Sequence, residues 1–177
     1  MKKLFLCCLL FNFIQFTHAE DLENNVRDYI KSGDWSDFKI VDSSFGRVAA
    51  TRAATEDKRT NTTLAFTYPT HDKCKLAPVE IIYKLDKRLD NDSEFEAYGN
   101  IQVDSGALRR VEAKIIQERG NEFVFIVVPD SNLDDMAQKG KTITVNFKGY
   151  GVVEFSLNGA KSAIGNAKSE CKNFDFS

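Results

Sequence analysis

The segment from Val152 to Cys171, VVEFSLNGAKSAIGNAKSEC, changes its hydrophobic period halfway along and ends on a cysteine. Before Asn158, apolar and polar residues alternate, which is typical of a strand with one buried face. Asn158 is a favourable helix N-cap, and small or apolar residues then recur at intervals of three and four: Ala160, Ala163, Ile164, Ala167 and Cys171. Because alanine allows close packing, we expect this terminal helix to lie on a sheet with its alanines inward.

The N-terminal segment MKKLFLCCLLFNFIQFTHAE has the features of a secretory signal peptide. Lys2 and Lys3 precede an apolar run that ends at a small-residue pattern closing on Ala19, as in cleaved signals. The run is shorter than the roughly 20 residues that a spanning helix needs, so a retained membrane anchor is the less favoured alternative. We predict a signal peptide over residues 1–19 and a single secreted β-rich domain over residues 20–177.

Cleavage after Ala19 removes Cys7 and Cys8 and leaves only Cys74 and Cys171. The mature chain then lies in a compartment where disulfides persist. We predict one disulfide between Cys74 and Cys171, which would tie the terminal helix to the middle of the chain. The alternative is two free thiols or a redox pair, but the chain has no Cys-x-x-Cys spacing.

Most of the remaining chain has the composition and period of β-strands. The runs WSDFKIVD, FGRVAATRA and TLAFTYP are rich in aromatic and β-branched residues and are separated by turn formers. Further along, the pattern predicts two strands joined by a polar loop at Asn91 to Ser93, a hairpin about Gly120-Asn121, and an antiparallel pair about Gly149. The polar stretch Thr55 to Thr63 is expected to be a solvated hairpin loop.

Two further helical segments are expected. In DLENNVRDYIKSG, apolar residues stand at helical spacing before a glycine stop: Leu22, Val26, Tyr29, Ile30 and Gly33. After Pro129, the pair Asp130-Ser131 can cap a short helix that ends at Gly140. The predicted fold is therefore mainly β, an antiparallel β-sandwich or curled sheet with an N-terminal helix and a C-terminal Ala-rich helix packed on it.

The charge balance and the known motifs exclude several classes of protein. The chain has 24 basic and 26 acidic residues, and loss of Lys2 and Lys3 leaves 22 against 26, a net charge of about −4. A nucleic-acid binder would show a concentrated basic face, so no nucleic-acid partner is expected. The sequence has no Gly-rich phosphate loop, no G-x-S-x-G elbow and no histidine pair for zinc. We expect no enzymatic activity, no cofactor and no metal.

Two clusters of chemically active residues have ordinary explanations. His71, Asp72 and Cys74 could suggest a nucleophile, but half of a disulfide explains Cys74 better. An acidic run could bind calcium through oxygen ligands: Asp86, Asp90, Asp92 and Glu94. It lacks the glycine of an EF-hand turn and is interrupted by Lys87 and Arg88, so a solvated loop is favoured.

Three residues are candidates for a binding surface. Trp35 is either a core anchor or a ligand platform, and the core is favoured. Asn91 and Asp92 lie in the polar loop that the pattern predicts between two strands.

Several of these features, in order along the chain, carry a family resemblance: an early Trp35, a mid-chain Cys74, the strand YKLDKRLD, a VD turn and the closing VEFSLNGAKSAIGNAKSEC. From Trp35 to Cys171 the chain resembles Gram-negative periplasmic proteins of the VasI/TagO type, which are accessory proteins associated with type VI secretion. Invasion-associated locus B proteins share a comparable end. The resemblance implies a mainly β fold, a Cys74–Cys171 disulfide and a non-catalytic role, and it carries no catalytic residues.

The expected function is that of a non-enzymatic binding or accessory protein of the bacterial envelope, periplasmic or secreted, with a role in secretion or host interaction. Its partner would be another envelope or secreted protein, or peptidoglycan. The alternative is an inhibitor of a cell-wall hydrolase such as lysozyme, which would insert the loop near Asn91 into the enzyme's cleft. An unrecognised hydrolase is the third and least favoured class.

Overall fold

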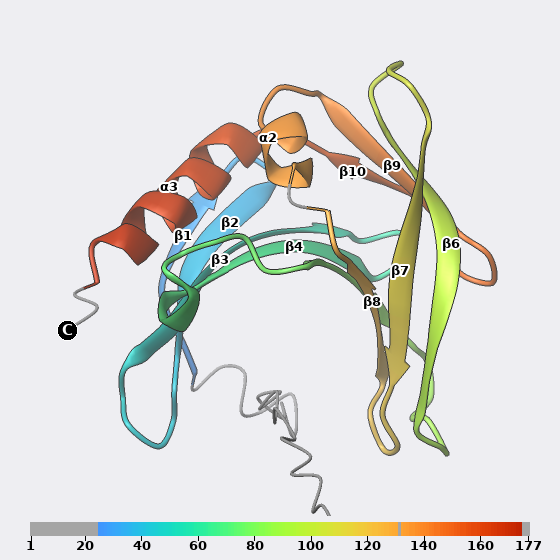
Figure 1. The fold of residues 1–177 in the computed structure, drawn as a ribbon, viewed down its shortest axis with the longest axis horizontal. Coiled ribbons are helices and arrows are strands. Elements are labelled where there is room, and N and C mark those ends of the chain that lie inside the picture. The colour runs from blue at the N-terminus through green and yellow to red at the C-terminus, as the bar shows by residue number, and fades with distance from the viewer. Residues whose placement is uncertain (1–24, 131, 175–177) are drawn as a thin grey trace, which may run out of the picture.

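The computed structural model describes residues 25–130 and 132–174, in which ten strands form one antiparallel sheet (Figure 1). The order of the strands across the sheet is β1-β2-β3-β4-β5-β8-β7-β6-β9-β10. Their bounds are β1 Val26–Ser32, β2 Trp35–Val41, β3 Val48–Asp57, β4 Thr62–Pro69, β5 Val79–Lys84, β6 Ser93–Val103, β7 Arg109–Gln117, β8 Phe123–Val128, β9 Thr142–Phe147 and β10 Gly151–Ser156. A 3-10 turn, η1 Thr70–Asp72, and two helices, α2 Leu133–Ala137 and α3 Ala160–Lys172, complete the described chain.

The sheet curls until its last strand returns over the second and third. Figure 1 shows β6, β7 and β8 crossing the direction of β3 and β4, with β9 and β10 above them. Apolar residues of the inner face fill the interior, the largest of them being Trp35, Tyr68, Phe66, Phe147 and Phe155. Of the two predicted arrangements, the structure has the curled sheet.

The C-terminal helix packs on the sheet as the sequence predicts. Its small or apolar residues form a buried row of Ala160, Ala163, Ile164, Ala167 and Cys171. The Thr51 hydroxyl on β3 donates a hydrogen bond of 2.6 Å to the carbonyl oxygen of Ala167. Cys74 and Cys171 form the predicted disulfide across 97 residues of sequence, with a Cα–Cα distance of 5.8 Å. The disulfide therefore links the segment after η1 to the last turn of α3.

The prediction of an N-terminal helix is wrong for the part of that segment that the structure describes. Val26–Ser32 forms strand β1, while Leu22 lies outside the described residues. A helix this short is marginal in water by itself. In an extended conformation the same residues can instead pair with β2. A bulge between Arg27 and Ile30, with Asp28 at φ 53°, shifts the register. This shift lets residues at helical spacing occupy a strand.

The last helix begins one residue later than expected. Gly159, with φ 93°, precedes it, and Asn158 makes no side-chain cap. A Cβ atom on Gly159 would lie 1.7 Å from the carbonyl oxygen of Ser32. Only glycine fits this position, because the turn between β1 and β2 packs directly on the junction of β10 and α3.

The other predicted elements occur with adjusted boundaries. Strands β5 and β6 exist and are joined by a polar loop, but they do not pair with each other, because β8 and β7 lie between them. The hairpins β7–β8 and β9–β10 are confirmed. The stretch Thr55 to Thr63 is mostly strand, since β3 continues to Asp57 and β4 begins at Thr62. Helix α2 also forms, although Ser131 lies outside the described residues.

Candidate functional site

A groove of about 730 Å³ runs between β10 and the adjacent ends of β1, β2 and β3. We call it the β10 groove. Its charged lining residues come from the β1–β2 hairpin, the β3–β4 hairpin and β10: Lys31, Asp34, Glu56, Asp57, Lys58, Arg59 and Glu154. The groove exists because the curled sheet brings β10 close to these strands without adding it to their hydrogen-bonded ladder.

One end of the groove is fixed where the β1–β2 turn and the start of β2 meet β3 and the end of β10. The Ser156 hydroxyl donates a hydrogen bond of 2.6 Å to Oδ2 of Asp34. The indole Nε1–H of Trp35 donates to the carbonyl oxygen of Ser156 at 2.8 Å. The Thr55 hydroxyl donates to the carbonyl oxygen of Asp34 at 2.8 Å. These bonds hold the last residue of β10 against the turn between β1 and β2.

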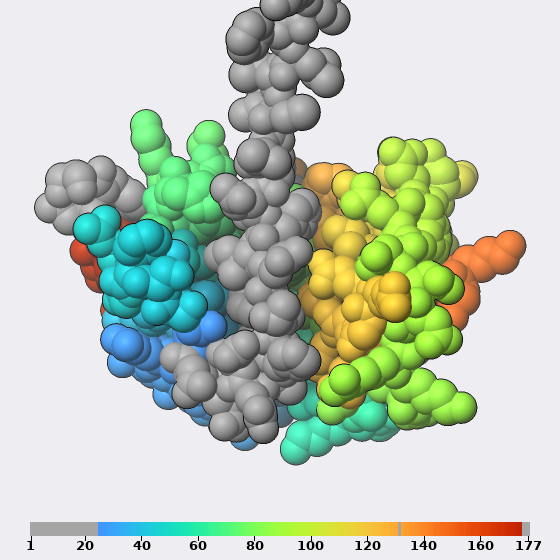
Figure 2. Space-filling view, turned by 90° about the horizontal axis from the view of Figure 1, so that it is seen from below, coloured from blue at the N-terminus to red at the C-terminus, as the bar shows by residue number. Residues whose placement is uncertain are grey.

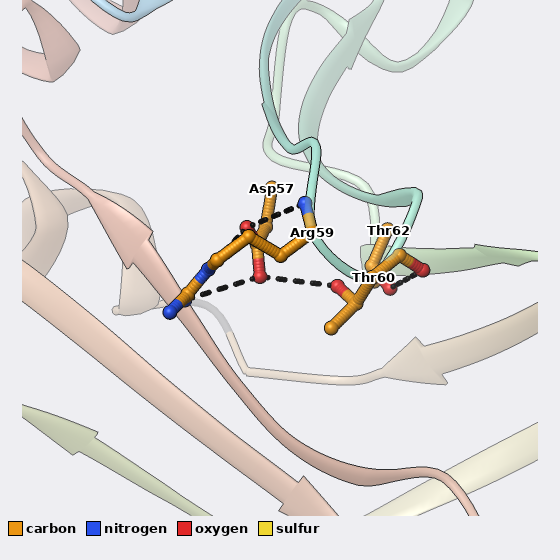
Figure 3. A network of polar contacts seen from close by, with 4 residues as sticks. All are labelled: Asp57, Arg59, Thr60 and Thr62. Carbon is orange, nitrogen blue, oxygen red and sulfur yellow. Dashed lines mark hydrogen bonds and ion pairs between the residues drawn. The ribbon is translucent and has the colours of Figure 1, made fainter.

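Asp57 organises the turn between β3 and β4 (Figure 3). Its Oδ1 accepts hydrogen bonds of 3.1 Å from both the backbone N–H and Nε of Arg59. Its Oδ2 accepts bonds from Nη2 of Arg59 at 3.3 Å and from the Thr60 hydroxyl at 3.1 Å. Figure 3 shows the carboxylate of Asp57 between these two side chains. The carboxylate therefore fixes both the turn and the direction of the guanidinium.

The electrostatics of this turn favour the ionised forms of both groups. Hydrogen bonds from the side chain of Arg59 are the main cause that lowers the pKa of Asp57. The pKa of Arg59 is raised, first by its hydrogen bond to Asp57 and to a smaller degree by the charge of Glu154 on β10. The Asp57 side chain is 7% exposed and that of Arg59 is 75% exposed. The nearly buried carboxylate of Asp57 thus holds the exposed, permanently charged guanidinium of Arg59 at the groove.

Aromatic residues form a second part of the lining. Tyr29 on β1 stacks on Phe38 on β2, with ring centroids 6.1 Å apart and planes inclined by 16°. The Ser36 hydroxyl donates a hydrogen bond to the Tyr29 hydroxyl. Because Tyr29 is 62% exposed, this pair gives the groove an apolar surface beside its charged groups.

The three sequence-predicted surface residues do not form one surface. Trp35 has no exposed side-chain area and stacks on Phe66 in the core, so it is not available to a partner. Asn91 and Asp92 are exposed in the loop between β5 and β6, where Oδ1 of Asp92 accepts a hydrogen bond of 2.7 Å from the backbone N–H of Arg119. Figure 2 shows this loop and the β7–β8 turn on the opposite side of the molecule from the β2–β3 loop.

The reactive clusters of the sequence have no special geometry. His71 is exposed on η1, and the sulfur of Cys74 is bonded to Cys171, so it offers no thiol nucleophile. Among residues 25–130 and 132–174, no three or more His, Cys, Asp or Glu side chains are grouped so that they could hold a metal ion. The acidic run around Asp90 does not form such a group. No helix in this part of the chain is both long and apolar enough to cross a membrane.

Little in the sequence pointed to the groove. Asp57 and Arg59 lie in the stretch Thr55 to Thr63, which alone reads as a solvated loop. The order Asp-Lys-Arg-Thr does contain a signal, because an Asp side chain often bonds to the backbone two residues later in a turn. Glu154 looks like any exposed strand position, and only the curl of the sheet brings it near Arg59.

No family model matches this chain, and no curated protein is significantly similar to it in sequence. A solved structure, invasion associated protein B from Bartonella henselae, has a TM-score of 0.56 and 15% sequence identity, covering 82% of this chain and 98% of that chain. At this identity the likeness shows the fold alone. It agrees with the resemblance to invasion-associated locus B proteins at the level of the fold, whereas the resemblance to VasI/TagO proteins stays a prediction.

Proposed function

We propose that this protein is an exported, non-enzymatic binding protein of the bacterial envelope, periplasmic or secreted, that holds a segment of another envelope or secreted protein in the β10 groove. The observation that carries the proposal is the groove itself, with the Arg59 guanidinium held in place by Asp57. Export is supported by the signal-like N-terminal segment and by the Cys74–Cys171 disulfide. The likeness of the fold to an invasion associated protein is consistent with a role in host interaction.

The chemistry of the groove suits a polypeptide. Lys31, Lys58 and the exposed part of Arg59 can attract carboxylates, and Glu56 and Glu154 can attract cations. The stacked pair of Tyr29 and Phe38 can contact apolar side chains. A peptide segment carries all three kinds of group, so a single ligand of this class can contact the whole lining of the groove.

Asp57 is better suited to binding than to catalysis. A general acid needs a carboxyl group whose pKa is raised toward the working pH. The pKa of Asp57 is lowered by Arg59, so this carboxylate stays ionised and holds no proton to deliver. Its role in the proposal is to position Arg59.

The proposal can be tested with a photo-crosslinking amino acid in the protein at its native expression level. Glu56 is an exposed position in the groove, and Lys161 is an exposed position on α3 that serves as the control. We expect one protein adduct from position 56, none from position 161, and loss of the adduct when Arg59→Glu is added. Equal labelling at both positions, or none at 56, would count against a groove ligand. Recovery of the protein with sedimented peptidoglycan instead would identify the cell wall as the partner.

A second candidate function rests on the loop between β5 and β6. Backbone hydrogen bonds tie this loop to the β7–β8 turn: Leu85 N–H to Glu122 O at 2.7 Å, Leu89 N–H to Asn121 O at 2.8 Å and Gly120 N–H to Leu89 O at 2.8 Å. A loop held in this way loses little conformational entropy when it enters a cleft. We propose as the alternative that it inhibits a cell-wall hydrolase such as lysozyme. Unchanged lysozyme turnover at large molar excess of the purified domain would rule this out.

A further inference from the structure

Strand β6 is longer than the strand beside it. It pairs with β7 from Ser93 to Ile101, but it pairs with β9 only from Gly99 to Val103. Strand β9 ends at Phe147, after which the chain turns into β10. Figure 1 shows the first part of β6 continuing beyond the region where β9 lies against it. Residues 93–98 of β6 therefore pair with β7 on one side only, and their other side is a sheet edge.

The backbone of this edge has unused hydrogen-bonding groups. The N–H of Asp104 donates to the carbonyl oxygen of Thr142 at 3.0 Å, so even-numbered residues of β6 direct their backbone toward the β9 side. By this alternation Glu94, Glu96 and Tyr98 point their N–H and C=O groups into the open edge. No described residue makes a backbone hydrogen bond to them there. Unpaired groups of this kind can accept an added strand.

The edge carries charged side chains but no bulge, proline or lysine. Sheet edges are commonly protected by charged side chains, above all lysine, by proline or by a bulge. The outer strand β1 has a bulge between Arg27 and Ile30. Residues 93–98 of β6 read SEFEAY, without proline or lysine, and pair with β7 in one continuous register.

The side chains along the edge alternate in chemistry. Glu94 and Glu96 are exposed on the outer face. Glu94 pairs with Lys114 at 2.6 Å, while Glu96 makes no ion pair within the described part of the chain. On the other face, Phe95 is 46% exposed and Ala97 packs against the core. A strand laid beside this edge would meet carboxylates on one face and apolar groups on the other.

From this arrangement we propose that the open edge of β6 binds an extended segment of a partner protein by strand addition, with Lys or Arg at alternate positions opposite Glu94 and Glu96 and apolar residues between them. Opposite charges across neighbouring strands stabilise pairing, and like charges directly opposite each other destabilise it. A second copy of this chain is therefore a poor occupant, because antiparallel pairing of two β6 edges about Glu96 would place the two Glu96 carboxylates opposite each other. This site is separate from the β10 groove.

The first test is amide hydrogen exchange of the mature protein by NMR. In the free protein we expect fast exchange at Glu94, Glu96 and Tyr98 and slower exchange at Phe95 and Ala97, whose N–H groups face β7. A short peptide of about six residues in which Lys and Val alternate should slow exchange at the three edge amides. Slow exchange at these amides without peptide, or no change on its addition, overturns the proposal.

The second test measures the affinity of the fluorescently labelled Lys/Val peptide by anisotropy. Glu96→Lys should weaken binding by about tenfold or more. Glu112→Lys makes the same change of charge one strand further from the edge, on β7, and should have a much smaller effect. Methylation of alternate peptide amides should abolish binding, because it removes the donors that would reach β6. Equal binding by the methylated peptide, or equal effects of the two charge variants, contradicts strand addition at this edge.

Discussion

The indole Nε1–H of Trp35 donates a hydrogen bond of 2.8 Å to the carbonyl oxygen of Ser156, although 121 residues separate them in the sequence. Trp35 begins β2 and Ser156 ends β10, and these two strands do not pair in the sheet. The bond therefore stabilises the curled sheet at a place where β2 and β10 come close without pairing as strands. It also fixes one end of the β10 groove.

Replacing Trp35 by Phe should lower the free energy of unfolding by about 2 kcal/mol, because the Ser156 carbonyl loses its partner and a cavity remains beside Phe66. Urea unfolding followed by circular dichroism gives this quantity. An unchanged midpoint and slope would show that the hydrogen bond and the packing of Trp35 contribute nothing net to the fold.

Gly159→Ala should destabilise the protein far more than Gly149→Ala. Both glycines have positive φ, 93° and 92°, but a Cβ on Gly159 would lie 1.7 Å from Ser32 O, whereas a Cβ on Gly149 meets nothing within 4 Å. Gly149→Ala bears only the backbone strain, about 1 to 2 kcal/mol. Thermal unfolding of the two variants measures the difference, and similar melting temperatures would contradict the close contact between the β1–β2 turn and the start of α3.

Tyr68→Phe and Tyr83→Phe should have different effects. The Tyr68 hydroxyl donates to Oδ2 of buried Asp134 at 2.9 Å, so its removal should cost roughly 1 to 3 kcal/mol. The hydroxyl of Tyr83 is buried and has no hydrogen-bond partner among the described residues. Its removal should leave stability unchanged or increase it. Denaturant midpoints of both variants decide between these outcomes.

Alkaline unfolding provides a control on Tyr83. Burial raises the pKa of Tyr83 to about 12, so the neutral phenol is favoured in the folded state. This contribution is complete below the unfolded pKa, about 10, and is lost as the pH rises toward the folded value. Tyr83→Phe should therefore lose less stability than the wild type between these two pH values.

Asp37→Asn and Asp57→Asn should change stability at neutral pH in opposite directions. Burial raises the pKa of Asp37, so its charged form is disfavoured in the folded state. Its contribution is present at low pH and is lost as the pH rises through the folded pKa, so Asp37→Asn should raise the melting temperature at pH 7. Hydrogen bonds from Arg59 lower the pKa of Asp57. That contribution is present above the unfolded pKa and is lost in acid, so Asp57→Asn should lower the melting temperature at pH 7.

The two differences should shrink over different pH ranges. For Asp37→Asn the difference should disappear as the pH falls from the raised folded pKa to the ordinary Asp value of about 3.9. For Asp57→Asn it should disappear below that value, as the pH falls to the lowered folded pKa. A difference that stays constant across the pH range would show that packing, rather than ionisation, separates the variants from the wild type.

Removal of the disulfide by the double substitution Cys74→Ala and Cys171→Ala should reduce the free energy of unfolding by up to roughly 4 to 5 kcal/mol, as expected for a closed loop of this length. The covalent link spans 97 residues and anchors the last turn of α3. Reduction of the wild type should produce a comparable shift. Two free thiols in the intact, non-reduced mature protein would contradict the bond itself.

Local patterns in the sequence were sufficient for most of the secondary structure. Alternation of apolar and polar residues identifies the strands, because a strand has a period of two and one face of this sheet is buried. The row from Ala160 to Cys171 identifies α3 and its buried face, and the two cysteines that lie outside the predicted signal segment identify the disulfide. The same local reasoning was wrong for Val26–Ser32, because pairing with β2 outweighs the propensity of a short helix.

Only the tertiary structure decided where distant residues meet. Which strands lie side by side depends on how the whole sheet curls, so the sequence did not reveal that β8 and β7 separate β5 from β6. For the same reason Arg59 and Glu154, which face one groove, looked like unrelated surface residues. The sequence determined the local period and the covalent link. The curl of the sheet, set by packing of the inner face about Trp35, determined the β10 groove, and the placement of the shorter strand β9 beside β6 determined the open edge of β6.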